Sequence, residues 1–218
     1  MGCALSGSGI TLGKSISEAK RCPSLDGGLE LKAESGEEKI AAQPFPLLEP
    51  QKELIQESWK ILHDDIARVG IIVFIRLFET HPECKDVFFL FRDIDDLQQL
   101  KMSKDLQSHG LRVMSFIEKS VARLDQEDKL EQLAFELGRS HCRYNAPPKY
   151  YEYVGTQFIG AVQPILKEKW TPEVEKAWET LFKYVTDTMK RGFYEEEKKS
   201  KVNQALYSRK AGAAQNSI

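Results

Sequence analysis

Apolar side chains recur every three or four positions through the middle of this 218-residue chain. That spacing places them on one face of an α-helix, whereas the alternation that indicates strands is not found. A polar stretch at 92–104 is expected to separate the second helix from the third, and Thr171-Pro172-Glu173 is typical of a helix start. We therefore predict an all-α fold. The expected helices begin near Pro50, Val69, Ser103, Leu130, Tyr151 and Pro172.

Two polar segments flank this helical region. The first 46 residues hold seven of the fourteen glycines, and no aromatic residue precedes Phe45. The last 24 residues are also polar, and Tyr207 is their only aromatic residue. Such segments cannot bury enough apolar surface to offset the entropy lost on ordering. We predict disordered extensions at residues 1–46 and 195–218 around one domain at 47–194.

Charge and hydropathy argue against several classes of protein. The 31 basic residues are balanced by 33 acidic ones, which gives no reason to expect a nucleic-acid partner. The longest apolar run, at 70–75, is far shorter than the roughly 18 residues that span a bilayer. The first residues lack the apolar region of a signal peptide. We therefore expect a chain that resides in the cytosol.

The four cysteines contain no CxxC pair, and in the cytosol they are expected to be thiols or lipid-attachment sites. A redox-responsive disulfide between Cys84 and Cys142 is one alternative, and Cys22 is a second candidate for lipid attachment.

Two of the four histidines lie on predicted apolar faces. His109 shares its helix face with Leu106 and Val113, and His141 lies four residues after Leu137. A neutral imidazole is a good ligand for haem iron, so two such helices could present one imidazole to each side of the metal. Each could equally be a core histidine with a hydrogen-bond partner, and spacing alone leaves both interpretations open. The other two histidines, His63 and His81, are expected at the surface.

Longer motifs surround these histidines. Three motifs follow one another along the chain: Phe74-Ile75-Arg76-Leu77-Phe78 with Pro82 after it, then Gln107-Ser108-His109-Gly110-Leu111-Arg112-Val113, and then Leu137-Gly138-Arg139-Ser140-His141. The segments at 53–60, 177–178 and 189–193 complete the set. Together, residues 50–194 resemble a globin, most closely the branch that contains neuroglobin and globin X. The resemblance implies a globin fold of six to eight helices around a pocket for haem b.

The same resemblance implies a role for individual residues. His141 would be the proximal iron ligand and His109, 32 residues earlier, the distal one. Phe88 would pack flat on the haem. The remaining cofactor-binding positions would be Phe74 in the distal pocket, Arg112 toward a haem propionate, Val113 one turn after the distal histidine, and Tyr151 facing the haem.

The chain opens with Met1-Gly2-Cys3-Ala4-Leu5-Ser6, which fits the pattern for myristoylation of Gly2. One myristoyl chain binds a bilayer only weakly, with an association constant of roughly 10⁴ M⁻¹. Residues 1–40 contain five basic and six acidic side chains, so they form no polybasic patch. The second signal is therefore expected to be palmitate on Cys3, and the polar segment would act as a tether. This start resembles globin X and predicts attachment to the cytoplasmic face of the plasma membrane.

A haem held by two histidines is six-coordinate at rest, which favours electron transfer, redox chemistry or gas sensing over bulk oxygen transport. The expected partners are O₂, CO, NO or nitrite as ligands, the lipid bilayer, and an unidentified electron donor or acceptor. Nitrite reduction, NO dioxygenation or protection of lipids are possible side activities. Two alternatives stay open: a five-coordinate globin for oxygen storage or transport, and a globin-shaped membrane sensor or adaptor without haem.

Overall fold

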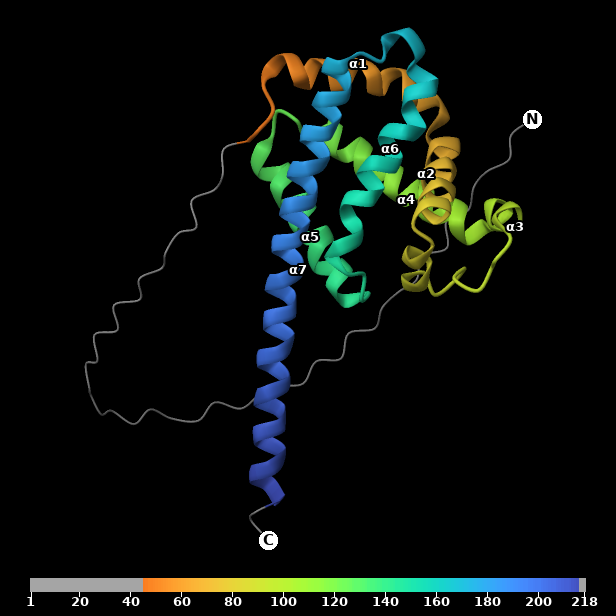
Figure 1. Ribbon diagram of the computed structural model, residues 1–218. Helices are drawn as coiled ribbons and strands as arrows, with labels where there is room; N and C mark the ends of the chain where they lie inside the picture. The colour runs from red at the N-terminus through yellow and green to blue at the C-terminus, as the bar shows by residue number, and fades with distance from the viewer. Residues whose placement is uncertain (1–44, 216–218) are drawn as a thin grey trace, which may run out of the picture. The chain divides into compact units, whose positions relative to one another are not determined.

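The computed structural model describes the backbone of residues 45–215 and the side chains of residues 45–205. Helices account for nearly all regular structure in this range and no strand occurs within it, as predicted (Figure 1). Residues 1–44, including the expected lipidation sites, lie outside the described part. The α-helices are α1 Glu49–Leu62, α2 Ile66–Thr80, α3 Leu97–Met102, α4 Lys104–Val121, α5 Glu127–Arg143, α6 Tyr151–Leu166 and α7 Pro172–Gln215. Short 3-10 turns join them at His63–Asp65, Pro82–Val87, Pro148–Tyr150 and Lys167–Lys169.

The predicted helix starts at Ser103 and Thr171 are confirmed. The Ser103 hydroxyl accepts from the Leu106 amide at 3.5 Å, and the Thr171 hydroxyl accepts from the Val174 amide at 3.4 Å. Each hydroxyl thus serves one of the amides that a first helical turn leaves without a partner.

One short helix was not expected. The polar stretch before Ser103 contains α3, which begins where the Asp96 carboxylate accepts from the Gln98 amide at 2.8 Å. Leu100 anchors this helix because its side chain is fully buried in the core. A single buried side chain in six residues gives too weak a periodic signal to predict a helix from sequence.

The buried apolar side chains form two clusters. The larger contains Trp59 and Trp178, whose ring centroids lie 6.3 Å apart. The smaller surrounds Phe74 on α2 and reaches into the segment that follows that helix. Val113 of α4 and Val154 of α6 pack against both clusters. The boundary between the two clusters therefore runs past α4 and α6.

Helices α5 and α7 lie side by side and approach each other at two glycines (Figure 1). A Cβ atom added at Gly138 of α5 would overlap the carbonyl oxygen of Met189, and one at Gly192 of α7 would overlap the carbonyl oxygen of Phe135. Only a residue without a side chain allows the two backbones to come this close. The position of α5 is thus fixed by direct backbone contact with α7.

The C-terminal segment differs from the sequence prediction. Residues 195–218 were expected to be disordered, but α7 continues without interruption to Gln215 (Figure 1). The segment contains no proline, and Glu–Lys pairs stand one turn apart at Glu195–Lys199 and Glu197–Lys201. Such pairs stabilise a helix, and low apolar content argued only against a core, not against helical backbone.

The glycine contacts predict the outcome of an alanine substitution. Gly138→Ala should lower the free energy of unfolding by about 3 kcal/mol, because the new methyl group meets a backbone carbonyl that cannot move aside. The matched control is Gly160→Ala, whose methyl group would meet only the exposed, flexible guanidinium of Arg76. That variant should be unchanged or up to about 1 kcal/mol more stable. Urea unfolding of both variants measures the difference, and equal midpoints would contradict the close packing of α5 on α7.

Candidate functional site

His109 lies on the buried face of α4 among aromatic side chains. Its ring stands edge-on to Phe74 of α2 at 4.9 Å and to Phe88 at 5.1 Å, measured between ring centroids. Phe74 is fully buried, whereas Phe88 and His109 are half-buried. The structure therefore brings together three of the residues that the resemblance assigned to the haem site.

His141 lies in the last turn of α5 with one ring nitrogen engaged. Its Nδ1 is 2.9 Å from the carbonyl oxygen of Leu137, which can only accept, so Nδ1 carries the proton. In the neutral ring, Nε2 then has a free lone pair, which is the atom a metal ion would bind. Tyr151, predicted to face the cofactor, lies edge-on to His141 at 5.3 Å and donates its hydroxyl proton to the Ala146 carbonyl at 3.1 Å.

Both imidazoles are neutral at physiological pH. Burial lowers the pKa of His141, although its hydrogen bond to Leu137 partly opposes the change. Burial also lowers the pKa of His109, to about 4, and the positive charges of Arg112 and of a protonated His141 contribute further. Neutral imidazole is the form that binds iron.

Arg112 lies on the exposed side of α4, and its Nη2 is 3.4 Å from Nδ1 of His109. Arginine only donates, so this long contact favours the tautomer in which Nδ1 accepts and Nε2 carries the proton. Iron binding through Nε2 requires the opposite tautomer. The Arg112 side chain therefore competes with ligation by His109, and its exposure leaves it free to turn away.

The residues present fit a haem group. Two neutral imidazoles come from different helices, His109 beside the smaller apolar cluster and His141 beside Tyr151 of the larger one. Val113, one turn after His109, packs against both clusters, so the flat apolar ring system would be bordered by both. Arg112 at the exposed edge suits a propionate carboxylate. This donor set, two nitrogens in apolar surroundings with one cation at the rim, is the chemistry that haem requires.

Two groups that contribute to the site, the Phe91 side chain and the Leu137 carbonyl, were not predicted from the sequence. Phe91 is buried, stacks on Phe88 with centroids 5.1 Å apart, and lies 6.4 Å from the His109 ring. Its spacing three residues after Phe88 was a usable signal, but the run 88–91 is apolar throughout and shows no single face. The Leu137 carbonyl, which orients His141, leaves no signal because every residue has one.

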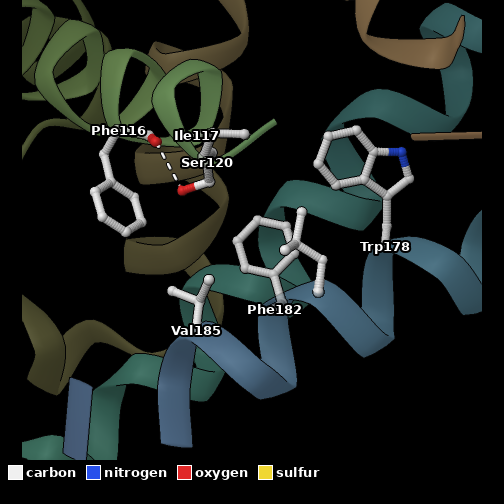
Figure 2. Close-up of a pocket in the computed structure, with 7 residues that line it drawn as sticks. Phe116, Ile117, Ser120, Trp178, Phe182 and Val185 are labelled. Carbon is white, nitrogen blue, oxygen red and sulfur yellow. Dashed lines mark hydrogen bonds between the residues drawn. The ribbon is translucent and has the colours of Figure 1, made fainter. Parts of the chain in front are cut away.

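A hollow lies between α4 and α7, and neither His109 nor His141 lines it (Figure 2). It measures about 210 Å³ with the solvent at its open side included, so it is a shallow hollow rather than an enclosed cavity. The Ser120 hydroxyl on its wall donates to the Phe116 carbonyl at 2.9 Å and is therefore already satisfied. We interpret this hollow as a packing gap. Its lining consists of Phe116, Ile117, Ser120, Trp178, Leu181, Phe182 and Val185.

Other sites considered from the sequence gain no support in the described residues. Cys84 and Cys142 are both free thiols, and burial raises the pKa of Cys84 to about 11, which keeps it protonated and unreactive. No group of three or more metal-ligating side chains occurs in residues 45–205. Among the described helices, none has the length and apolar content needed to cross a membrane.

Comparison with known proteins agrees with this geometry. A family model described as Globin matches residues 72–189. Cytoglobin-1 of Oryzias latipes is 28% identical over 167 residues, which cover 76% of this chain and 94% of the relative. Neuroglobin-1 of Oncorhynchus mykiss is 30% identical over 147 residues, covering 67% of this chain and 92% of the relative. Neuroglobin of Tetraodon nigroviridis is 31% identical over 142 residues, covering 65% and 89%.

A solved structure supports the fold independently. The hexacoordinated heme protein from an anhydrobiotic tardigrade, determined at pH 4, superposes with a TM-score of 0.65 and 24% identity. The match covers 70% of this chain and 99% of that one, which confirms the predicted globin fold. The chain belongs to the globin family, and this membership implies that it binds haem and gaseous ligands.

Proposed function

We propose that this globin holds haem b between His141 and His109, releases His109 when a gas molecule binds, and works in redox chemistry, electron transfer or gas sensing beside a membrane. The observation that carries the proposal is the pair of neutral, half-buried imidazoles on α4 and α5, one of which has a free Nε2. Haem, when bound, supplies an iron that exchanges electrons and accepts small ligands.

His141 is the stronger candidate for a permanent ligand. Its Nδ1–H bond to the Leu137 carbonyl fixes both the tautomer and the ring orientation before any metal binds. Tyr151 packs against the ring, and its hydroxyl is held by Ala146, so it does not compete for the imidazole. Little rearrangement of these residues is needed for His141 to bind iron.

His109 is suited to a reversible bond. Phe74 and Phe88 hold its ring in apolar surroundings, while Arg112 favours the tautomer that cannot bind iron through Nε2. The site is open to O₂, CO, NO or nitrite only in the fraction of molecules whose His109 has left. The apparent dissociation constant is then the intrinsic one divided by that open fraction.

One observation favours a second candidate function. With its proton on Nε2, as the Arg112 contact prefers, His109 would donate a hydrogen bond to a gas molecule rather than bind iron. The protein would then be a five-coordinate oxygen-binding globin. The balance between the two functions depends on one tautomer and can be measured directly.

We also propose attachment to the cytoplasmic face of the plasma membrane through myristate on Gly2 and palmitate on Cys3. The support is the sequence at residues 1–6 together with the near-equal charges of residues 1–40, which require a second lipid rather than a basic patch. This start is also what supports a narrower similarity to globin X. A globin held at a membrane cannot carry gas between sites, which favours local redox chemistry with a membrane-associated electron partner.

Histidine replacements test the two iron ligands. His141→Ala should retain less than about a tenth of the haem of the unmodified chain, because the permanent ligand is lost. His109→Ala should retain haem and give a high-spin, five-coordinate ferrous spectrum. The surface substitution His63→Ala is the control and should change neither result. Full haem retention by His141→Ala, with an unchanged spectrum, would contradict the assignment of the proximal ligand.

Membrane fractionation tests the anchor. Gly2→Ala should move the protein from the membrane fraction to the soluble fraction, because it removes one of the two acyl chains that stable attachment requires. Cys3→Ala should leave only weak attachment that is released on washing, as expected for one acyl chain. Ser24→Ala, in the same segment but without a thiol, serves as the control and should leave fractionation unchanged. Unchanged fractionation of both the Gly2 and Cys3 variants would rule out the dual-lipid proposal.

A further inference from the structure

Glu196 of α7 forms two charge-assisted hydrogen bonds with the end of α5. Its Oε2 accepts from Nε of Arg139 at 2.8 Å, and its Oε1 accepts from Nε of Arg143 at the same distance. The Glu196 side chain is only 14% exposed, the lowest value among the acidic partners of the described ion pairs. Charge-assisted bonds that are partly shielded from water are stronger than ordinary surface ion pairs.

The two arginines bracket the iron ligand. Arg139 and Arg143 are one turn apart, and His141 stands midway between them in sequence. Because each residue turns the helix by about 100°, both arginines project from the face opposite to His141. Glu196 therefore binds α5 on the face opposite to the one that carries the His141 imidazole.

This end of α5 is the part of the helix that needs support. His141 lies in the last turn, where backbone carbonyls lack helical partners and helices fray. Beyond Arg143, the chain turns sharply through Asn145, whose φ of 56° lies in the left-handed region. The Ala146 amide donates to the His141 carbonyl at 2.9 Å and closes this turn. Without a tie to another helix, the turn that carries the ligand would be among the least stable parts of α5.

The close packing of α5 on α7 brings Glu196 within reach. Gly192, whose backbone touches that of Phe135, stands one turn before Glu196 on the same face of α7. Glu196 lies beyond residue 189, where the match to the globin family model ends. The contact thus belongs to the extended part of α7.

We propose that Glu196 is a positioning residue for the proximal ligand: through Arg139 and Arg143 it holds the last turn of α5 and so sets the strength with which His141 binds haem iron. The proposal rests on the assignment of His141 in the proposed function. It makes the extension of α7 a functional part of the site rather than an appendage.

A matched control exists on the same pair of helices. Arg191 of α7 donates to Glu131 of α5 at 2.6 Å, near the start of α5 and far from His141. Glu131→Gln removes one α5–α7 ion pair without touching the ligand's turn, whereas Glu196→Gln removes the charge and one of the two acceptor oxygens that contact that turn. A role in general helix packing would affect both variants alike.

The first measurement is haem loss from the full-length ferric protein to an excess of apomyoglobin. Glu196→Gln should accelerate haem loss about tenfold, the lower end of the effect of removing a residue that orients a metal ligand. Glu131→Gln should change it by less than about twofold. Arg143→Gln, a milder change at an exposed side chain, should act in the same direction, and the double variant Glu196→Gln/Arg143→Gln should lose haem no faster than Glu196→Gln.

Two further readouts separate positioning from stability. Hydrogen exchange of the chain without haem should be faster in Glu196→Gln at the amides of residues 142–146, but unchanged at the start of α5. In a His109→Ala background, resonance Raman of the ferrous protein should show the iron–histidine stretch at lower frequency for Glu196→Gln than for Glu131→Gln. Unfolding alone does not shift that band.

These outcomes separate a failure of the proposed function from a failure of the positioning role of Glu196. If His141→Ala keeps its haem, the proposed function fails and the role of Glu196 fails with it. If His141→Ala loses haem while Glu196→Gln matches Glu131→Gln in haem loss, local exchange and Raman frequency, the positioning role alone is overturned.

Discussion

The backbone contact between α5 and α7 is the constraint on which the site depends. Gly138 lies three residues before His141, and its packing against Met189 fixes how far α5 stands from α7. Side chains at this crossing would push α5 outward and carry His141 with it. The Leu137 carbonyl then orients the imidazole, and Glu196 holds the turn in which it lies. The spacing of the two backbones, the orientation of the ring and the support of the helix end thus all determine the position of one atom, Nε2 of His141.

In the proposed function, two opposing influences act on His109 as the distal ligand. Burial among Phe74 and Phe88 keeps His109 neutral, which permits iron binding, while Arg112 stabilises the tautomer that opposes it. In the proposed function, His141 stays bound to the iron and His109 leaves it, which would let a six-coordinate globin still bind gases.

Local patterns predicted much of this structure, and long-range contacts did not. Periodic apolar residues and the caps at Ser103 and Thr171 located the main helices. Motif resemblance singled out His109 and His141, whose roles as iron ligands stay predictions. Helix α3 was not predicted because a single buried leucine produces no periodic pattern of apolar residues. The C-terminal part of α7 was not predicted because low apolar content was taken to indicate disorder. The contact of Glu196 with Arg139, 57 residues away, leaves no trace in local sequence, since charged residues are common on every exposed face.

The most direct test of the central claim is the visible absorption spectrum of the purified full-length protein, loaded with haem and reduced in the absence of gas. Iron held by both His109 and His141 gives a sharp low-spin pair of bands, which is the result that we predict. A single broad high-spin band would show that His109 is not a ligand at rest. Absence of a Soret band after haem supplementation would contradict the account as a whole.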